Sequence, residues 1–347
     1  MKSDDVSTAL HLIGRLGLTL DDLAVASTAS APTPTFHAFL ARLRSAVPPS
    51  TLQSYGTYWR IIEAQWGDRL LDEPSPTEIS VMVEDHRQRA VVRTNSRGGH
   101  GATRMFIAAF RCLYKHAERD GLIHPLRNPA AKVDKPRQLP SPRHALSLRQ
   151  IEDLAQVAAS TGDDPDLDAL IMRLHIETAC RRGGALHLRV DGLDHEDCLV
   201  LLREKGGNLR WQPVSPTLMR YLALHVETRG GIEATSAVLR YRTGRPVGRR
   251  RYNYLRERFH HHLPWAATLG VTAHWVRHTT LTFVEREFGY AVARAFAGHA
   301  DSGGGRASTT HTYVRATLAE VAEAVEALTG EPHPLARRHR HPLAPGR

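Results

Sequence analysis

Apolar residues recur at helical spacing along most of this chain. The clearest segment spans residues 102–118, where an apolar side chain returns every third or fourth position, as on the buried face of an amphipathic helix. Similar segments fill residues 36–128 and predict a helical domain there. A weaker pattern over residues 1–35 predicts one helix, followed by a flexible connector with the sequence ASTASAPTPT. The apolar positions of the clearest segment are Phe106, Ala109, Phe110, Leu113, Tyr114 and Ala117.

The pattern stops over residues 129–145, where prolines and basic residues replace the apolar positions and predict an interdomain linker. A second domain, residues 146–330, begins with a helix that Ser147 would cap. Residues 198–203 and 209–214 flank the glycine-bearing turn EKGGN and predict a β-hairpin among further helices. A basic, proline-rich stretch, residues 331–347, predicts a disordered tail. The expected fold class is mainly α with a small antiparallel β-sheet.

The charge of the chain favours a polyanionic partner, with nucleic acid first. Its 347 residues carry a formal net charge of +10. On the helix predicted over residues 102–118, the face opposite the apolar stripe carries Arg104, Arg111 and Lys115. These three residues are equally consistent with a solvated charged face and with contacts to DNA phosphates.

Other classes of protein are disfavoured by what the sequence lacks. The three cysteines, Cys112, Cys180 and Cys198, lie far apart, which argues against a disulfide framework and a cysteine-based zinc site. The chain has neither a signal-peptide pattern nor an apolar run of the roughly 20 residues that span a bilayer. We therefore expect a cytoplasmic protein with no membrane partner, associated with the nucleoid when bound to DNA.

A dense polar motif, TAHWVRHT, occupies residues 272–279. His274 and Arg277 are three positions apart and would share one face at the start of a helix capped by Thr272. Free N–H groups and the positive end of the helix dipole make such a start an anion-binding site. A metal site is the weaker interpretation, because Arg277 would repel a cation and no acid or thiolate ligand is spaced to match. His278 is expected to form a hydrogen bond within the fold.

Further candidates for chemistry lie elsewhere in the second domain. Arg181 follows a long apolar helix, where burying an arginine is costly unless it is paired. Lys205 sits on the predicted hairpin turn, His299 follows a glycine, and Tyr313 lies beyond the sequence SGGGRA. This set suits phosphoryl transfer without a metal, because it has no carboxylate cluster for magnesium. Cations would neutralise the non-bridging oxygens, an acid would protonate the leaving oxygen, and a tyrosine oxygen would attack phosphorus.

The order and wording of these segments resemble the tyrosine recombinase (phage integrase) family. Its catalytic segments are resembled by four parts of this chain, over roughly residues 145–330: TACRRGGAL, REKGGNLRWQPVS, TAHWVRHT, and AGHADS with STTHTYVRA. Two further segments resemble its helical core-binding domain: STLQSYGTYWRIIEAQWG and RCLYKHAERDGLIHPLRNPA. The positions that match the family's catalytic residues are Arg181, Lys205, His274, Arg277, His299 and Tyr313.

The resemblance implies a two-step exchange of DNA strands. Tyr313 would attack a scissile phosphate and form a 3′-phosphotyrosyl bond, while Arg181 and Arg277 hold the non-bridging oxygens. Lys205 would protonate the departing 5′-oxygen. The 5′-hydroxyl of a partner strand would then reverse the step, so no ATP, metal or other cofactor is implied.

The resemblance also implies roles for the two histidines and a set of partners. His274 would assist proton transfer, and His299 would hydrogen-bond the phosphate. The partners would be double-stranded DNA with inverted-repeat core sites, further copies of the chain in a homotetramer, and possible accessory DNA-bending proteins. The helix over residues 317–329 would either pack on its own domain or dock on a neighbouring protomer.

Two features depart from the family's pattern. Gly184 stands where the family has an acid, and the interval between His299 and Tyr313 is lengthened by a glycine-rich insert. Tyr290 is a rival nucleophile but lies in an amphipathic segment, GYAVARAFAGH, and is interpreted as a packing residue. Three alternatives stay open: a type IB topoisomerase, a DNA-binding protein with decayed catalysis, and a metal hydrolase built on the HHH sequence at residues 260–262.

Overall fold

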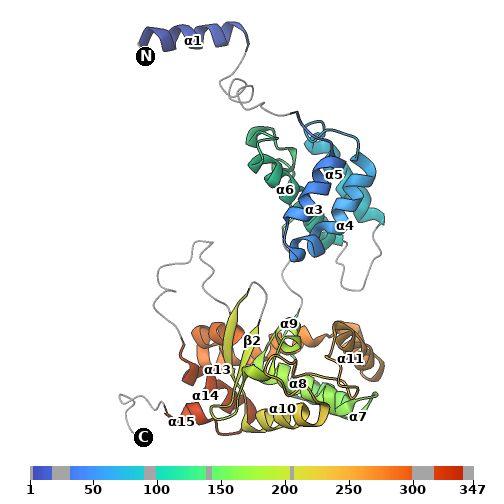
Figure 1. Ribbon diagram of the computed structural model, residues 1–347, viewed down its shortest axis with the longest axis vertical. Coiled ribbons are helices and arrows are strands. Elements are labelled where there is room, and N and C mark those ends of the chain that lie inside the picture. The colour runs from blue at the N-terminus through green and yellow to red at the C-terminus, as the bar shows by residue number, and fades with distance from the viewer. Residues whose placement is uncertain are drawn as a thin grey trace. The chain divides into compact units, whose positions relative to one another are not determined.

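The computed structural model describes residues 3–17, 32–89, 99–137, 143–203, 207–298 and 316–338. The chain divides into two compact units, Met1–Pro140 and Ser141–Arg347 (Figure 1). Helices dominate the described parts of both units, and a three-stranded antiparallel sheet lies in the second. The expected fold class, mainly α with a small antiparallel β-sheet, is confirmed. No helix in the described ranges combines the length and the apolar character that crossing a membrane requires.

The first unit consists of helices whose apolar stripes meet in one core. Trp59 and Tyr114 are fully buried there, and their polar atoms are satisfied. The indole N–H of Trp59 donates to the Ala109 carbonyl at 3.1 Å, and the Tyr114 hydroxyl donates to the Leu71 carbonyl at 2.8 Å. The elements are α1 (Ser3–Arg15), α3 (Phe36–Ala46), α4 (Pro49–Trp66), α5 (Pro76–Arg89), α6 (His100–Arg119), η2 (Pro125–Arg127) and η3 (Pro129–Ala131).

The predicted linker begins too early. Ala130 and Val133 are buried in the core of the first unit, so this part of residues 129–145 belongs to that unit. At the other end, Leu146 is buried in the core of the second unit. Its backbone N–H donates to the Thr279 hydroxyl at 3.0 Å. The apolar residues at the ends of the proline-rich stretch thus pack on the unit next to them. The composition of the stretch did not predict this packing.

Two of the three basic residues proposed as phosphate contacts bind this same segment. Arg104 donates to the Pro136 carbonyl, and Arg111 donates to the Val133 carbonyl at 2.8 Å. Both arginines are half-buried, whereas Lys115 is exposed. The two arginines therefore stabilise the end of the first unit, and a phosphate contact by any of the three stays a prediction.

The second unit carries the sheet and the remaining helices. Strands β2 (Leu199–Arg203) and β3 (Leu209–Pro213) form the predicted hairpin, and β1 (Leu193–Asp194) adds a short strand that the sequence pattern did not predict. Ser147 caps α7 as expected, in a capping box with Gln150. The other elements are α7 (Leu148–Ser160), α8 (Pro165–Thr178), α9 (Arg182–Leu186), η4 (Val190–Gly192), α10 (Pro216–Arg229), α11 (Arg249–His262), α12 (Pro264–Leu269), α13 (Ala273–Ala297), α14 (Leu318–Thr329) and α15 (Pro334–Arg338).

Helix α14 and the residues that follow it as far as Arg338 pack on their own unit. The apolar side of α14, including Val321 and Val325, is buried against Phe296 of α13 in one cluster. Of the two roles considered for residues 317–329, the structure shows packing within the unit, and docking on a neighbour stays a prediction. The tail predicted as disordered is ordered as far as Arg338, since His333 is 1% exposed and its Nε2 lies 3.3 Å from the Cys198 carbonyl. Residues 339–347 lie outside the described ranges.

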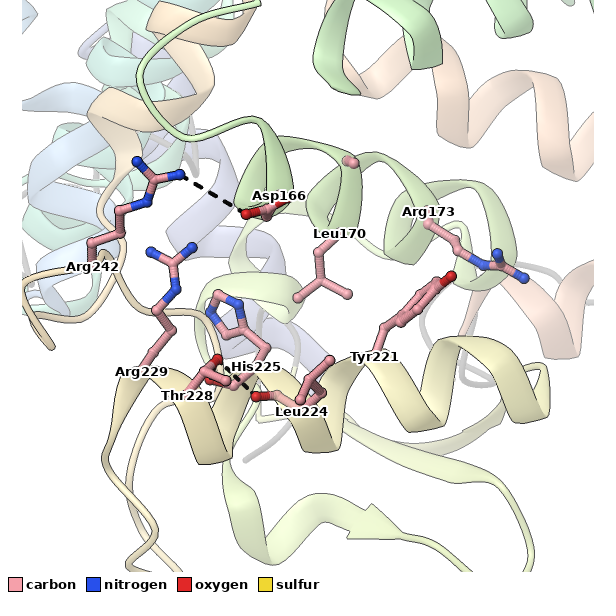
Figure 2. A pocket seen from close by; sticks show the side chains of 10 residues that line it. Asp166, Leu170, Arg173, Tyr221, Leu224, His225, Thr228, Arg229 and Arg242 are labelled. Atoms are coloured by element: carbon pink, nitrogen blue, oxygen red, sulfur yellow. Dashed lines mark hydrogen bonds and ion pairs between the residues drawn. The ribbon is translucent and has the colours of Figure 1, made fainter. Parts of the chain in front are cut away.

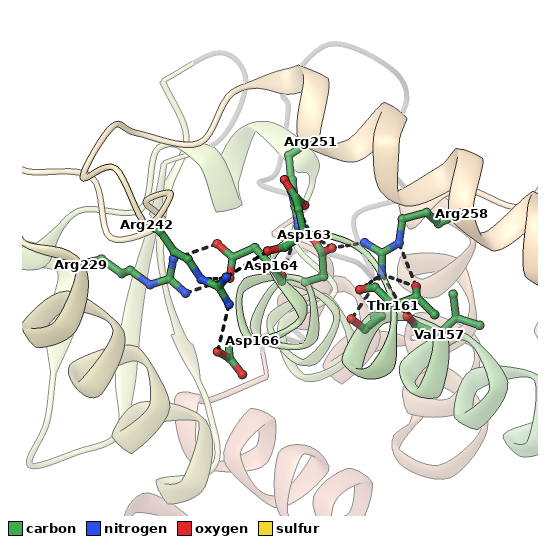
Figure 3. Close-up of polar contacts among 11 residues, drawn as sticks. Val157, Thr161, Asp163, Asp164, Asp166, Arg229, Arg242, Arg251 and Arg258 are labelled. Atoms are coloured by element: carbon green, nitrogen blue, oxygen red, sulfur yellow. Dashed lines mark hydrogen bonds and ion pairs between the residues drawn. The ribbon is translucent and has the colours of Figure 1, made fainter.

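A buried ionic cluster joins the start of α8 to α10 and α11 (Figure 3). The carboxylate of Asp168 is fully buried and accepts two hydrogen bonds of 2.7 Å from Arg251 and one from Arg258. Asp164, at the N-terminus of α8, accepts two bonds of 2.8 Å from Arg229. Charged groups are stable in a protein interior only when they are paired in this way.

Acid is expected to weaken this cluster through Asp164. Burial alone would raise the pKa of Asp164, but hydrogen bonds and charge from Arg229 hold it below the ordinary value. A lowered folded pKa stabilises the protein above the ordinary aspartate pKa of about 3.9, and that stabilisation is lost as the pH falls through the folded value. Urea unfolding at pH 5 and pH 3 measures the effect. Asp164→Asn should lose less stability than wild type over this interval, and an equal loss in both would contradict the assignment.

Candidate active site

The candidate site is organised around the turn that follows α8. The helix ends at Thr178, Ala179 adopts a left-handed conformation with φ of 46°, and Arg181 is the N-cap residue of α9. The last carbonyls of a helix have no partner within it and lie at the negative end of its dipole. Donors, preferably cationic ones, are therefore required around this turn.

Side chains from three elements supply those donors. The carbonyls of residues 178, 179 and 180 accept hydrogen bonds from Arg210 of β3, Arg277 of α13 and His175 of α8, in that order. The nitrogen–oxygen distances are 3.3 Å for Arg210 and 3.1 Å for His175. Three consecutive peptide groups just before Arg181 are thus fixed by side chains, which lets a non-glycine residue hold the left-handed position.

The two adjacent arginines face different surroundings, as their positions at a helix end suggested. Arg181 is half-buried and Arg182 is exposed. Of the two, Arg181 is therefore the one less exposed to solvent. Gly184, which stands where the family has an acid, is buried within α9. Support for the turn comes instead from the hydrogen bonds that reach it from β3, α13 and α8.

The motif TAHWVRHT opens α13 as predicted, with one exception at the cap. The helix starts at Ala273, but the Thr272 side chain accepts no capping hydrogen bond. Arg277 is 3% exposed and donates to the Ala297 carbonyl at 2.8 Å in addition to its bond at the turn. His278 forms the expected bond within the fold, since its Nε2 lies 3.2 Å from the Arg143 carbonyl.

His274 lies at the exposed start of the same helix. Partial loss of hydration, followed by the charges of Arg143, Arg277 and other cations nearby, lowers the pKa of His274 below its ordinary value. The ring is therefore neutral at pH 7, and one nitrogen is available to accept a proton. A neutral imidazole beside arginines suits proton transfer next to an anionic group.

The structure brings together the three described residues of the predicted set, Arg181, His274 and Arg277. Lys205, His299 and Tyr313 lie outside the described residues.

Residues that flank those positions are linked to the elements of this site. Asn208, just after the hairpin tip, donates from Nδ2 to the Gly298 carbonyl at 2.8 Å. Ala297 is held by Arg277, so the end of α13 is tied both to the hairpin and to the turn before Arg181. Ala316, the first described residue after the glycine-rich insert, packs on the cluster that contains Ala179. The segments that lead to Lys205 and His299 are thus joined by one hydrogen bond, and the residue that follows the insert packs on the cluster to which Ala179 belongs.

Sequence reasoning missed several residues of this site. His175 and Tyr252 form a buried pair beside the turn, and Arg210 binds the end of α8. The signal for His175 was available, because a histidine in the apolar segment ALIMRLHIETAC needs a buried partner. Tyr252 and Arg210 carried no such signal. Tyr290, interpreted as packing, is instead 53% exposed, since α13 is interrupted at Gly289.

Other features of the second unit are separate from this site. A hollow of about 800 Å³ lies between α8 and α10 (Figure 2), and Arg181, His274 and Arg277, the predicted catalytic residues that the structure describes, do not line it. Its cations are paired: Arg229 with Asp164, Arg242 more loosely with Asp164 and Asp166, and Arg173 with Glu177 and Glu331. In the described part of the chain, no group of three or more histidine, cysteine, aspartate or glutamate residues is placed to hold a metal. His260 of the HHH sequence is committed to the Val271 carbonyl at 3.0 Å.

Comparison with known proteins shows which solved structures share this fold. No protein-family model matches the chain. A lambda integrase dimer bound to a COC′ core site superposes with a TM-score of 0.59 at 16% identity, covering 90% of this chain and 86% of that one. The Tn1549 transposon integrase with a circular intermediate DNA gives 0.58 at 17% identity, covering 76% and 90%. At such identities the structural matches establish the fold alone.

The sequence adds a relationship of its own. The tyrosine recombinase XerC of Pelobacter propionicus is 24% identical over 232 residues, which cover 67% of this chain and 72% of the relative. The turn before Arg181 and the start of α13, which carry the family's motifs, meet in the structure as a common site requires. The chain is thus similar in fold to the lambda and Tn1549 integrases and similar in sequence to a tyrosine recombinase.

Proposed function

We propose that this chain is a site-specific DNA recombinase that cuts and rejoins strands through a covalent bond between Tyr313 and a 3′-phosphate. The observation that carries the proposal is the meeting of Arg181, His274 and Arg277 around one turn, with residues that flank Lys205 and His299 joined beside it. Arginine forks at this place can neutralise the non-bridging oxygens of a phosphate. The phosphotyrosyl bond conserves the energy of the broken phosphodiester, so the exchange needs neither ATP nor a metal.

Each remaining residue has a defined task in this proposal. Neutral His274 accepts or relays a proton as the tyrosine oxygen attacks, which agrees with its lowered pKa. His299 hydrogen-bonds the phosphate, and Lys205 protonates the departing 5′-oxygen. A 5′-hydroxyl from a second strand then attacks the phosphotyrosine and releases the enzyme.

The proposed partners are duplex DNA with inverted-repeat core sites and further copies of this chain. A lambda integrase of the same fold has been crystallised as a tetramer bound to a Holliday junction, with a TM-score of 0.58. Two cuts on each of two duplexes require four active sites, which supports a homotetramer here. Docking of residues 317–329 on a neighbour would first require α14 to leave the core that it shares with Phe296. Accessory DNA-bending proteins belong to the same proposal as possible partners.

Covalent trapping tests the proposed function. The full chain is incubated with fragments of the source DNA in the presence of a chelator and without divalent metal. After denaturation, only DNA that stays linked to protein is recovered and sequenced. We expect adducts clustered at one sequence with imperfect inverted repeats. Tight binding without any adduct would instead support the binding-only alternative, and adducts spread without a preferred site would favour a topoisomerase-like activity.

Arg277→Lys is expected to slow adduct formation by about 10²- to 10³-fold. Removal of one preorganised hydrogen-bond donor from other active sites has an effect of this size. A lysine offers one point charge in place of a planar fork, so it cannot hold the carbonyls of Ala179 and Ala297 and also a phosphate. Single-turnover cleavage at saturating protein measures the rate. The exposed neighbour of Arg181 provides the control, Arg182→Lys, which should cleave within about twofold of wild type because its charge is kept in solvent. Equal rates for the two variants would contradict the assignment.

A further inference from the structure

A buried histidine–tyrosine pair beside the turn has no task in the proposed reaction. His175 of α8 is 1% exposed and Tyr252 of α11 is 7% exposed. The His175 Nε2 lies 2.9 Å from the Tyr252 hydroxyl, and the two rings meet edge to face with centroids 5.5 Å apart. Burying two polar side chains is costly unless each finds a partner, so the pair is a built feature of the core.

The hydrogen bonds place a hydrogen on one nitrogen of His175. The Cys180 carbonyl can only accept, so the His175 Nδ1 that lies 3.1 Å from it carries the hydrogen. The Cys180 Sγ lies 3.6 Å from the same nitrogen and shares that N–H. In the neutral ring Nε2 is then the acceptor, and the Tyr252 hydroxyl donates to it. Burial raises the pKa of Tyr252 well above its ordinary value, so the hydroxyl keeps its proton.

This arrangement acts on Arg181 through one peptide group. The carbonyl of Cys180 and the N–H of Arg181 belong to the same planar unit, so a bond that fixes one fixes the other. That plane, together with the φ angle of Arg181, −73°, sets the direction in which the Arg181 side chain leaves the backbone. Of the three carbonyls held at the turn, the one bound by His175 is the nearest to Arg181.

We propose that His175 and Tyr252 are positioning residues, which orient Arg181 toward the scissile phosphate by holding the Cys180 carbonyl. The inference rests on the proposed function, because Arg181 must act on a phosphate for its orientation to matter. Gly184 stands where the family has an acid, and the pair supports the arginine from the side of α8 and α11 instead. Neither residue touches the DNA in this proposal.

Two variants of His175 test whether its N–H donor to the Cys180 carbonyl is the group that matters. His175→Leu removes both nitrogens, whereas His175→Asn keeps an N–H near the place of Nδ1. We expect His175→Leu to slow single-turnover cleavage by about tenfold to a hundredfold, with DNA affinity within about threefold of wild type. His175→Asn should recover most of the rate. Tyr252→Phe, which removes one oxygen and keeps the buried ring, should show the same kind of loss to a smaller degree.

The matched control is another buried histidine of the same unit. His333 is also 1% exposed and bonds a backbone carbonyl, that of Cys198, at 3.3 Å. His333→Leu therefore removes a comparable interaction at a place that does not adjoin Arg181 in the chain. Its cleavage rate should stay within about threefold of wild type, as expected for a change that acts only on stability.

A modified substrate identifies the group through which the pair acts. In a DNA whose scissile phosphate carries a methyl group in place of one non-bridging oxygen, the phosphate has no charge for Arg181 to neutralise. If the pair acts through Arg181, the loss caused by His175→Leu should shrink to less than about threefold on this neutral substrate. A defect in folding or in delivery of the tyrosine would slow both substrates equally.

The outcomes distinguish this inference from the proposed function. Absence of an adduct with wild-type protein would overturn the proposed function and this inference with it. Wild-type adduct formation together with unchanged rates in His175→Leu and Tyr252→Phe would overturn the inference alone. Equal losses on the charged and neutral substrates would likewise overturn the inference and leave the proposed function standing. If His175→Leu does not fold, Tyr252→Phe and His175→Asn carry the comparison.

Discussion

Tyr313→Phe is expected to abolish the covalent protein–DNA adduct, lowering its rate of formation by at least about four orders of magnitude. The change removes one oxygen, which is the atom proposed to bond phosphorus, and leaves an aromatic ring of the same shape. DNA affinity should stay within about threefold of wild type, because binding depends mainly on cations that contact phosphates. Adduct is measured by denaturing electrophoresis of end-labelled DNA, and affinity by titration with the same DNA.

The chain offers its own matched control for this prediction. Tyr290 is 53% exposed on α13, precedes the glycine–histidine pair and is the tyrosine that sequence reasoning considered as a rival nucleophile. Tyr290→Phe removes the same atom from a second tyrosine and should leave the adduct intact. Loss of the adduct in Tyr290→Phe and its survival in Tyr313→Phe would transfer the nucleophile to α13. Survival in both would exclude either tyrosine as the attacking group.

Local sequence signals predicted the helices and the hairpin well. The apolar stripe over residues 102–118 became α6, Ser147 became an N-cap with a capping box, and the two short segments that flank the glycine-bearing turn became β2 and β3. Each of these depends on residues a few positions apart. The strand β1 was missed because two residues, Leu193 and Asp194, are too few to show an alternation.

Features that depend on distant partners could not be read in the same way. Nothing in the sequence tells which side chain will reach the carbonyls at the end of α8, since Arg210 and Arg277 come from segments more than thirty residues away. The tail after Gly330 looked disordered by composition, yet Glu331 bonds Arg173 at 2.6 Å and His333 is buried. In both cases the deciding interaction is a polar contact between remote residues, which periodicity does not encode.

Asp168→Asn is expected to destabilise the second unit by about 3–5 kcal/mol, as does removal of one partner from other buried ion pairs. The carboxylate is fully buried and neutralises Arg251 and Arg258, which are 4% and 7% exposed. An asparagine amide of the same size would leave two buried guanidinium groups without a counter-charge from this position. It would also turn one of its N–H groups toward donors that cannot accept a hydrogen bond.

Hydrogen exchange of the full chain measures this effect where it arises. Because 1.36 kcal/mol corresponds to a factor of ten, peptides of α8 and α11 should lose protection by about a hundredfold to several thousandfold, and peptides of α6 in the first unit should be unchanged. Asp166→Asn is the control: its side chain is 84% exposed and lies 3.9 Å from Arg242, so its loss should cost less than about 1 kcal/mol. Since α8 leads directly into the turn that carries Arg181, Asp168→Asn should also slow cleavage at temperatures where α8 opens. Unchanged protection in α8 would mean that the two arginines find other partners, and that the cluster is not what anchors this helix.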